Sequence, residues 1–366
     1  MRLSGKVERA LERAEGGDFA PGDAHGGDLA LARKAFPAAP EPWLDLSTGV
    51  SPYSYPFRAP PPESWTRLPA GAELAALEGA AAASWRLAPE TRVVAAPGTQ
   101  AIISWLPHLF PARRVGVLGF TYFEHARVWA ASGAAVSTVD DVGQLEDKDV
   151  AIIVNPNNPD GRIVAPDRLG ALADTLQRRG KLLVVDEAFA DFLPPGVRPP
   201  RALVLRSFGK AYGLPGLRLG FAIAPADMAL KLRAALGCWP VSGAAIAIGV
   251  EALCDSAWLA ATREKLAADA ASLDAILAAA GFTLCGVTPL FRLAAAPDAP
   301  RRFQALGEAG IWVRRFEARP DWLRFAIPNS EADRARLRAA LDAPNKKPRL
   351  FSDPSVSEKS SSLKCF

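Results

Sequence analysis

Residues 207–220 read Ser207-Phe208-Gly209-Lys210-Ala211-Tyr212-Gly213-Leu214-Pro215-Gly216-Leu217-Arg218-Leu219-Gly220. They follow 202–205, a short apolar run that predicts a buried strand. A lysine among small residues at a strand end can be desolvated, which lowers its pKa and makes its amine a usable nucleophile. The serine before Lys210 and the arginine after it are donors that an oxyanion or a phosphate would need. For this segment alone, a basic surface loop with glycine turns is the simpler alternative, so the rest of the chain has to decide.

The composition predicts a globular protein, large enough for two domains. Of its 366 residues, 49% are hydrophobic and 22% are charged, which excludes a disordered or fibrous class. The net charge of +4 is too small and too scattered to indicate nucleic-acid binding, although it suits an anionic small molecule. The chain opens with charged residues, and no apolar run approaches the length of a membrane span. We therefore expect a cytoplasmic protein that binds neither nucleic acid nor membrane.

Cysteines and histidines predict no metal site. The four cysteines lack the spacing of metal ligands, and we expect them to be small apolar side chains in a reducing compartment, buried except in the tail: Cys238, Cys254, Cys285 and Cys365. The three histidines are scattered along the chain, which argues against a histidine-based zinc site.

Short apolar strands alternate with helices from Arg92 onward. We expect strands at 93–96, 115–118, 136–139, 150–154, 182–185 and 202–205, with helices at 99–106, 123–131 and 166–178. This alternation is typical of an α/β domain with a mostly parallel sheet, in which ligands bind beyond the carboxyl ends of the strands. The side chains that follow each strand are therefore the candidates for a site.

The chain divides into four expected parts. Residues 1–40 form an N-terminal arm, 41–230 a large α/β domain, and 231–343 a smaller α+β domain that the arm completes. The smaller domain is expected to contain helices at 242–253, 257–280 and 331–341 and strands at 291–294, 312–314 and 323–326. The segment 344–366 is rich in Lys, Ser and Pro, and we expect it to be disordered.

Two of the strand ends carry groups that could hold a planar anionic ligand. Gly98, Thr99 and Gln100 open a helix, whose free backbone N–H groups and positive dipole end form an anion site, although an ordinary helix cap is the simpler alternative. Tyr122 follows the next strand, where its ring could stack on a planar ligand or belong to the core.

Two further strand ends carry an amide and a carboxylate. Asn158 lies in an Asn/Pro/Gly turn that could fix its amide toward a ligand. Asp186 follows four apolar residues, so its partly desolvated charge needs a cation or a metal nearby. A lysine amine, an anion site, a stacking ring, an amide and a carboxylate at one sheet edge match the needs of pyridoxal phosphate.

The motif Ser-Phe-x-Lys-x-x-Gly-x-x-Gly-x-Arg-x-Gly at 207–220 resembles that of the fold-type-I pyridoxal-phosphate enzymes, in the class I/II aminotransferase superfamily. The resemblance extends over 25–341 and implies a large domain with a mostly parallel sheet and a smaller α+β domain. It implies that Lys210 binds the cofactor covalently, that Asp186 pairs with the pyridine nitrogen, and that Asn158 donates to the 3′-oxygen. It further implies that Tyr122 stacks on the ring and that the other cofactor-binding residues, most of them around the phosphate, are Gly98, Thr99, Gln100, Ser207 and Arg218.

The resemblance also implies substrate ligands in the second half of the chain. Arg324 aligns with the arginine that clamps the substrate carboxylate, a task that suits a bidentate guanidinium. Arg314 aligns with an arginine that histidinol-phosphate aminotransferases direct at the substrate phosphate, although Arg315 is the alternative because strand neighbours face opposite sides. His25 is either a further ligand of that phosphate or a surface residue of the arm. We interpret Glu124-His125 as ordinary helix residues.

Within the superfamily, the chain is similar to the threonine-phosphate decarboxylases of cobalamin biosynthesis. This similarity rests on the arm at 25–28, on Phe189 where most aminotransferases have a tyrosine, and on the segments 312–316 and 322–325. It implies decarboxylation of L-threonine O-3-phosphate to (R)-1-amino-2-propanol O-2-phosphate and CO2. An aminotransferase acting on histidinol phosphate or a related amino substrate is the alternative, and a third hypothesis is a binding protein that keeps only the fold.

A homodimer is expected by analogy, because relatives build their active sites across a dimer interface. Two positions depart from the pattern of the relatives at this boundary. Leu68 stands where many of them place a tyrosine from the neighbouring subunit, and Val50-Ser51-Pro52 replaces an asparagine-proline pair.

Overall fold

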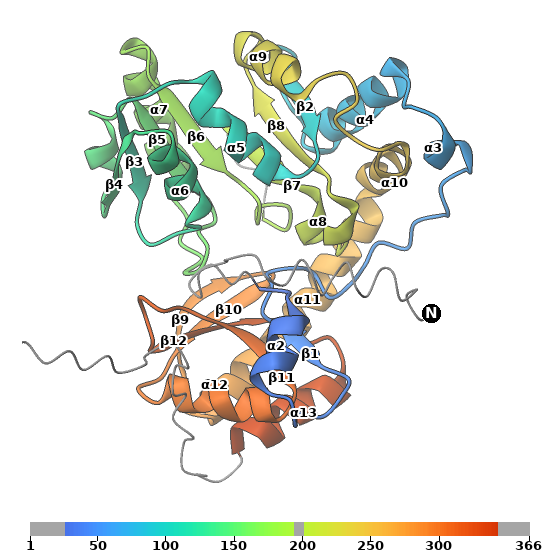
Figure 1. Cartoon of the computed structure of the whole chain (residues 1–366), viewed down its shortest axis with the longest axis vertical. Helices are drawn as coiled ribbons and strands as arrows, with labels where there is room; N and C mark the ends of the chain where they lie inside the picture. Colours follow the sequence, from blue (N-terminus) through green and yellow to red (C-terminus); the bar gives the residue numbers. More distant parts are fainter. Residues whose placement is uncertain (1–25, 194–200, 343–366) are drawn as a thin grey trace, which may run out of the picture.

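The computed structural model describes residues 26–193 and 201–342, which form two sheets, each with its own helices (Figure 1). We call the seven-stranded sheet and its helices the large domain, and the five-stranded sheet and its helices the small domain. Residues 1–25 of the N-terminal arm, which include His25, and the tail at 344–366 lie outside the described residues.

The sheet of the large domain is mostly parallel, as expected. Its strand order is β2-β8-β7-β6-β5-β3-β4, and only β8 runs antiparallel to its neighbours. The bounds are β2 Arg92–Ala96, β3 Arg114–Leu118, β4 Ala135–Val139, β5 Val150–Val154, β6 Leu182–Asp186, β7 Leu203–Ser207 and β8 Gly220–Ala224. The sequence analysis missed β8, because the glycine-rich motif runs directly into this short strand.

Helices cover both faces of this sheet, and alternating strand residues supply the two cores. The helices are α3 Glu63–Thr66, α4 Gly71–Ser84, α5 Thr99–Leu109, α6 Glu124–Ala131, α7 Pro166–Arg178, α8 Phe208–Ala211, α9 Ala226–Leu236 and α10 Gly243–Cys254. On α7, Leu169, Leu172 and Leu176 recur at helical spacing and pack with Val185 of β6. On the other face, Leu106 of α5 packs with Val184. Neighbouring residues of one strand therefore enter opposite cores.

The small domain contains a sheet in the order β1-β11-β12-β10-β9. Its strands are β1 Leu44–Leu46, β9 Thr283–Thr288, β10 Phe291–Ala295, β11 Ile311–Arg315 and β12 Trp322–Ala326, and its helices are α2 Leu29–Ala35, α11 Ser256–Ala279, α12 Ala299–Glu308 and α13 Glu331–Asp342. The strand β1 pairs in parallel with β11, so it lies in the small sheet although its residues fall within the segment expected to form the large domain. The sequence analysis also missed β9 and α12.

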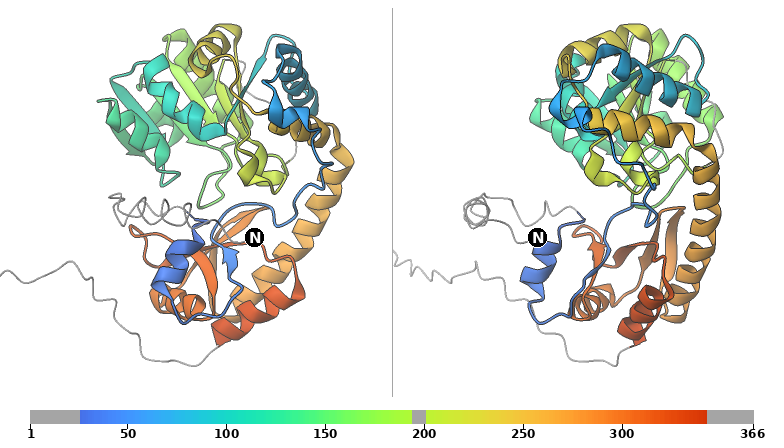
Figure 2. Two further views of the ribbon diagram at one scale, coloured as in Figure 1. Left: turned by 45° about the vertical axis from the view of Figure 1, so that its right-hand side comes forward. Right: turned by 90° about the vertical axis from the view of Figure 1, so that its right-hand side faces the viewer.

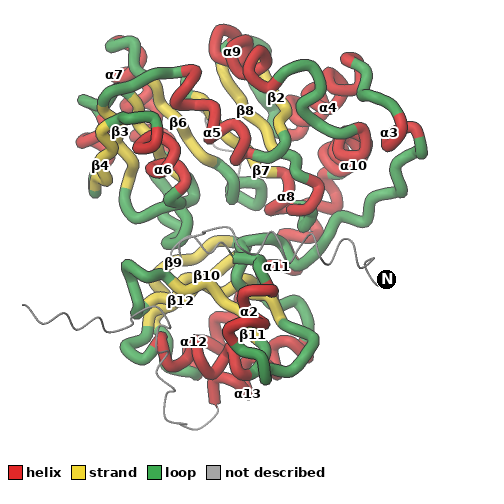
Figure 3. Tube along the Cα trace, in the orientation of Figure 1, coloured by secondary structure: helices red, strands yellow, loops and turns green. Residues whose placement is uncertain are grey.

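The helix α11 links the two domains along one side of the molecule (Figure 2). The edge of the large domain that faces the small domain consists mostly of loops, with α8 among them (Figure 3). These loops follow the carboxyl ends of the parallel strands, so the candidate residues of the sequence analysis lie at the boundary between the domains. Of the described helices, none is by itself long and apolar enough to cross a membrane, and α10 with α11 would qualify only as a pair bent by 76°.

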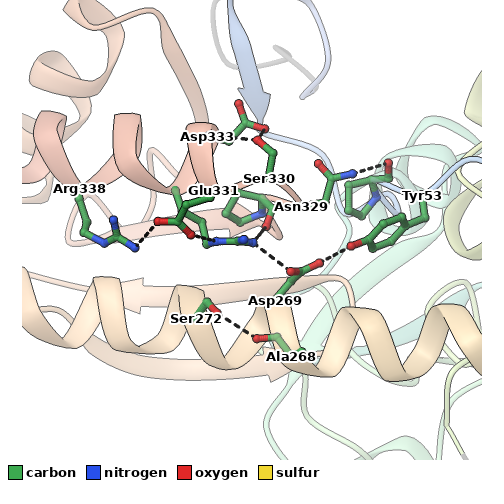
Figure 4. Close-up of polar contacts among 12 residues, drawn as sticks. Tyr53, Ala268, Asp269, Ser272, Asn329, Ser330, Glu331, Asp333 and Arg338 are labelled. Carbon is green, nitrogen blue, oxygen red and sulfur yellow. Dashed lines mark hydrogen bonds and ion pairs between the residues drawn. The ribbon is translucent and has the colours of Figure 1, made fainter.

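The segment between β1 and α3 ties the small domain to α8. The Tyr53 hydroxyl donates to Asp269 Oδ2 of α11 at 2.6 Å, and Asp269 Oδ1 accepts from Arg334 of α13 at 2.9 Å (Figure 4). The backbone N–H of Ser51 donates to the carbonyl of Lys210 at 2.8 Å. Burial, together with the hydrogen bond to Asp269, raises the pKa of Tyr53 to about 12, so this hydroxyl stays a donor.

The cysteines depart from expectation. Cys238, Cys254 and Cys285 are exposed rather than buried. Each lies near the end of a helix or in an edge strand, where a small side chain is not needed to fill a core.

Candidate functional site

Lys210 lies in the short helix α8, which begins directly after β7 ends. Its neighbour Gly209 has no room for a side chain, because a Cβ there would lie 2.7 Å from the Cα of Pro215. The Lys210 amine lies 5.5 Å from the ring centroid of Phe189. Burial, followed by the charges of Arg324 and Arg218, lowers the pKa of Lys210 to about 8, although Asp186 acts in the opposite direction. A far larger fraction of this amine than of an ordinary lysine is therefore uncharged near neutral pH, and that form can act as a nucleophile.

Asp186 ends β6 and is buried. Its Oδ1 accepts from the backbone N–H of Ala188 at 3.0 Å, and its Oδ2 lies 2.9 Å from His125 Nε2. His125 comes from α6 and is itself fully buried, so its interpretation as an ordinary helix residue is wrong. These two contacts fix the orientation of the carboxylate. The sequence offered one signal for this role: His125 comes three residues after Tyr122, on the first turn of a helix that follows a strand.

An anion cradle forms where α5 begins. Gly98 caps the helix with φ 86°, and a Cβ there would lie 2.8 Å from Nη2 of Arg218. A Cβ on Gly220 would lie 2.5 Å from the backbone nitrogen of Thr99. These two glycines let the guanidinium and the strand β8 approach the helix start. A helix N-terminus beside an arginine is a suitable site for a phosphate.

Tyr122 and Gln100 are joined by a hydrogen bond beside this cradle. The Tyr122 hydroxyl donates to Gln100 Oε1 at 3.0 Å, and Gln100 Nε2 donates to Glu124 Oε2 at 2.7 Å. Glu124 is buried, so it too is wrongly described as an ordinary helix residue. These contacts hold the tyrosine ring at the side of the cavity.

Asn158 and Arg324 connect the two domains. The Asn158 side-chain oxygen accepts from Nη1 of Arg324 at 2.6 Å, and Nη2 of Arg324 donates to the carbonyl of Ser47 at 2.8 Å. Because the oxygen of Asn158 is committed to the guanidinium, its NH2 group is the end left to meet a ligand. Nε of Arg324 is buried and has no hydrogen-bond partner among the described residues. An anionic ligand would satisfy this donor.

The strand register places Arg314 beside Arg324. The two residues are direct partners between β11 and β12, so their side chains leave the same face of the sheet. Arg315 is exposed, and its guanidinium lies 5.3 Å from the ring centroid of Phe303 of α12. Of the two arginines, Arg314 is therefore the one on the same face as Arg324, and its role toward a substrate phosphate stays a prediction. Burial, followed by the neighbouring Arg315, lowers the pKa of Arg314, and burial followed by Arg314 lowers the pKa of Arg324. A buried guanidinium next to a half-buried one favours a ligand with two anionic groups.

Aromatic rings border the two arginines. Phe120 of the large domain contacts Phe316 and Trp322 of the small domain, with ring centroids 5.8 and 5.9 Å apart. Phe316 and Trp322 lie two residues from Arg314 and Arg324, hence on the same face of the sheet. On the other side, Phe189 packs edge-on against Phe291 at 5.2 Å and offers no hydroxyl to the cavity.

One cavity collects every residue that the sequence analysis assigned to the cofactor. Its lining includes Gly98, Thr99, Gln100, Tyr122, Asn158, Asp186, Ser207, Lys210 and Arg218. Arg324 reaches this cavity through Asn158, and Arg314 lies next to Arg324. Their roles toward a ligand stay predictions. Among residues 26–193 and 201–342, no cluster of His, Cys, Asp and Glu could hold a metal ion.

These residues fit pyridoxal phosphate. The cavity offers an amine of lowered pKa, a buried carboxylate, a helix start beside a guanidinium, an amide donor and an aromatic ring. In the same order, these five groups match the aldehyde, the ring nitrogen, the phosphate, the 3′-oxygen and the face of the ring of that cofactor.

A family model and individual known proteins both resemble this chain. Residues 62–343 match the family model described as aminotransferase class I and II. The chain is 40% identical to a threonine-phosphate decarboxylase of Sinorhizobium sp over 329 residues, which cover 87% of this chain and 97% of that protein. It is 38% identical to a threonine-phosphate decarboxylase of Pseudomonas aeruginosa, over 87% of this chain and 96% of that protein.

Solved structures share the fold. The histidinol-phosphate aminotransferase from Sinorhizobium meliloti, crystallised in complex with pyridoxal-5′-phosphate, superposes with a TM-score of 0.72 at 19% identity. The alignment covers 93% of this chain and 96% of that chain.

Proposed function

This chain belongs to the class I and II aminotransferase family, and we propose that it is a pyridoxal-phosphate-dependent decarboxylase of L-threonine O-3-phosphate. The products are (R)-1-amino-2-propanol O-2-phosphate and CO2, and the pathway is cobalamin biosynthesis. Proteins that align over 96% and 97% of their own length carry the name threonine-phosphate decarboxylase, which supports this substrate rather than another amino acid.

The observation that carries the proposal is the pair Arg314 and Arg324. Both side chains leave one face of the small sheet, beside the cavity that holds Lys210. Two like charges directly opposite each other on neighbouring strands repel, and an anionic ligand between them would offset that repulsion. L-threonine O-3-phosphate has a carboxylate and a phosphate close together, so one molecule can meet both guanidiniums.

The residues of the chain divide the work of the reaction. When bound, pyridoxal phosphate supplies an aldehyde that takes up the substrate amine and a ring that accepts the electron pair released at Cα. Asp186, oriented by His125 and the N–H of Ala188, would hold the proton of the ring nitrogen. The amide of Asn158 would donate to the 3′-oxygen, and the helix start at Thr99 with Arg218 would bind the cofactor phosphate.

Arg324 and Arg314 determine which bond at Cα breaks. Arg324 holds the substrate carboxylate and Arg314 the phosphate, so the substrate is fixed at two ends. By fixing both ends, this clamp would present the bond between Cα and the carboxylate for cleavage, and CO2 would leave. The Lys210 ammonium would donate the proton that replaces CO2 at Cα.

The test is a product assay with purified protein, pyridoxal phosphate and L-threonine O-3-phosphate. We expect equal amounts of CO2 and aminopropanol phosphate, both abolished by Lys210→Ala. Transfer of the amino group of histidinol phosphate to 2-oxoglutarate, which forms glutamate without CO2 release, would instead establish the aminotransferase alternative. Absence of both products together with a colourless protein would favour a binding protein.

We further propose that two copies of the chain form a homodimer in the cytoplasm. The support is an exposed apolar face: Trp65 is 68% exposed, Leu68 63% and Trp239 59%. A Cβ on Gly243 would lie 2.6 Å from the carbonyl of Ser64, so α3 packs against the start of α10 and brings Trp65 and Trp239 to one region. Sedimentation at micromolar concentration should give twice the chain mass, and Trp65→Glu should shift it toward the monomer. A monomeric wild type would refute the proposal.

A further inference from the structure

A buried carboxylate stands behind the cavity, on the helix that follows Tyr122. Glu124 is only 4% exposed, and its Oε2 accepts from Gln100 Nε2 at 2.7 Å. Arg127, one turn along α6, donates from Nε to Oε1 at 2.8 Å and from Nη2 to Oε2 at 2.6 Å. Glu124 lines no part of the cavity, whereas Gln100 and Tyr122 both do. This carboxylate is therefore linked to the cavity through Gln100, which hydrogen-bonds Tyr122.

The ionised carboxylate fixes the direction of the hydrogen bonds that lead to Tyr122. A carboxylate paired with arginine has acceptors only, so the NH2 group of Gln100 must face Glu124. The reverse orientation would place two acceptor oxygens 2.7 Å apart. The Gln100 oxygen consequently faces Tyr122, and the Tyr122 hydroxyl must donate to it, at 3.0 Å.

We propose that Glu124 is a positioning residue: acting through Gln100, it fixes the ring of Tyr122 and directs the Tyr122 hydroxyl proton onto Gln100 rather than onto a ligand. The ligand then meets a held aromatic face and an oxygen lone pair. Such an oxygen suits the guanidiniums around the cavity and would not protonate the cofactor phosphate or the substrate. This inference rests on the proposed function, because the ligand beside Tyr122 is the proposed cofactor.

Two substitutions at Glu124 separate the effect of hydrogen-bond direction from the effect of side-chain shape. Glu124→Leu removes the acceptor and leaves Gln100 without a fixed orientation. Glu124→Gln keeps the shape but can both donate and accept, so it no longer enforces the direction. We expect pyridoxal phosphate to bind the apoprotein about tenfold more weakly in the leucine variant and about threefold more weakly in the glutamine variant. The visible circular dichroism of each bound cofactor should fall in both, because the ring that contacts it is less fixed.

Glu78 is the matched control. It is also largely buried, its Oε1 accepts from the N–H of Ala95 at 3.0 Å, and it pairs with Arg233, but it does not touch the cavity. Glu78→Gln should lower the melting temperature of the apoprotein while leaving the affinity for pyridoxal phosphate and the circular dichroism unchanged. A loss of cofactor affinity in this control equal to that of Glu124→Gln would overturn the inference.

A double-mutant cycle with Tyr122→Phe tests whether Glu124 acts through the Tyr122 hydroxyl. The phenylalanine has no hydroxyl to direct, so adding Glu124→Gln to it should change the affinity for pyridoxal phosphate by less than about 1.5-fold. An undiminished threefold effect would show that Glu124 acts by another route and would overturn the inference. A wild type that does not bind pyridoxal phosphate would refute the proposed function itself, whereas a binding wild type with unaltered Glu124 variants would refute only the role of Glu124.

Discussion

Arg314 and Arg315 are adjacent on β11, and the same substitution in each should have very different effects. Arg314 is the register partner of Arg324 and faces the cavity side of the sheet, whereas Arg315 is exposed beside Phe303. Arg314→Gln therefore removes one of two neighbouring cations from the substrate site. Arg315→Gln removes the same charge from the opposite face and serves as the matched control.

The magnitude follows from the kind of contact that is lost. A hydrogen bond to a charged group contributes about 1.5–3 kcal/mol, and a guanidinium can make two of them to a phosphate. Loss of both corresponds to about 3–6 kcal/mol, or a decrease in kcat/KM of about 10²- to 10⁴-fold. The apoprotein should not be destabilised by the loss of charge, because burial and the neighbouring arginine already disfavour the charged form and lower the pKa of Arg314.

The assay compares two substrates. For L-threonine O-3-phosphate, Arg314→Gln should lower kcat/KM by at least about 100-fold, and Arg315→Gln by less than about twofold. For L-threonine, which lacks the phosphate, Arg314→Gln should change the slow CO2 release by less than about threefold. Equal losses for both substrates would mean that Arg314 supports the fold and not the phosphate, and a larger loss in the Arg315 variant would refute the assignment from the register.

Three further predictions follow from particular contacts. Phe189→Tyr adds a hydroxyl beside the cavity, which should lower the pKa seen in the absorbance titration of the bound cofactor by up to ~1 unit, and an unchanged or raised pKa would refute this. Tyr53→Phe should cost about 1.5–3 kcal/mol in urea unfolding because it removes the donor to Asp269. The Tyr55 hydroxyl makes contacts of only 3.3 and 3.5 Å, so Tyr55→Phe should lower the free energy of unfolding by less than half as much. Equal losses in the two variants would contradict the role of the Tyr53 contact. Because the pKa of Lys210 falls from its ordinary 10.5 to about 8 in the folded protein, the unfolded chain binds more protons between these values. The wild-type apoprotein should then gain stability relative to Lys210→Met as the pH rises through this window, by up to about 3 kcal/mol in denaturant titrations at the two ends, and a parallel pH dependence would contradict the burial of this amine.

The groups that follow the parallel strands could be predicted from the sequence. Gly98, Tyr122, Asn158, Asp186 and Lys210 each lie at the end of an apolar strand or within four residues after it. A parallel sheet brings such positions to one edge, however the helices pack. The chemistry of each group is also local, since a lysine or a carboxylate at a strand end is recognisable without its neighbours.

Contacts that depend on the rotation of a helix or on the strand register could not be predicted from the sequence. His125 reaches Asp186, and Glu124 reaches Gln100, only because α6 has a particular rotation against the sheet, which depends on packing. The choice between Arg314 and Arg315 needed the register between β11 and β12. The position of β1 in the small sheet likewise depends on pairing with a strand more than 260 residues later in the chain.

The central claim is that the amine of Lys210 binds pyridoxal phosphate covalently. Borohydride reduction of the purified protein, followed by proteolysis and mass spectrometry, tests it without any substrate. We expect one phosphopyridoxyl group per chain, on the peptide that contains Lys210, and none in Lys210→Ala. An unmodified Lys210 in cofactor-saturated protein, or an adduct on another lysine, would contradict the account.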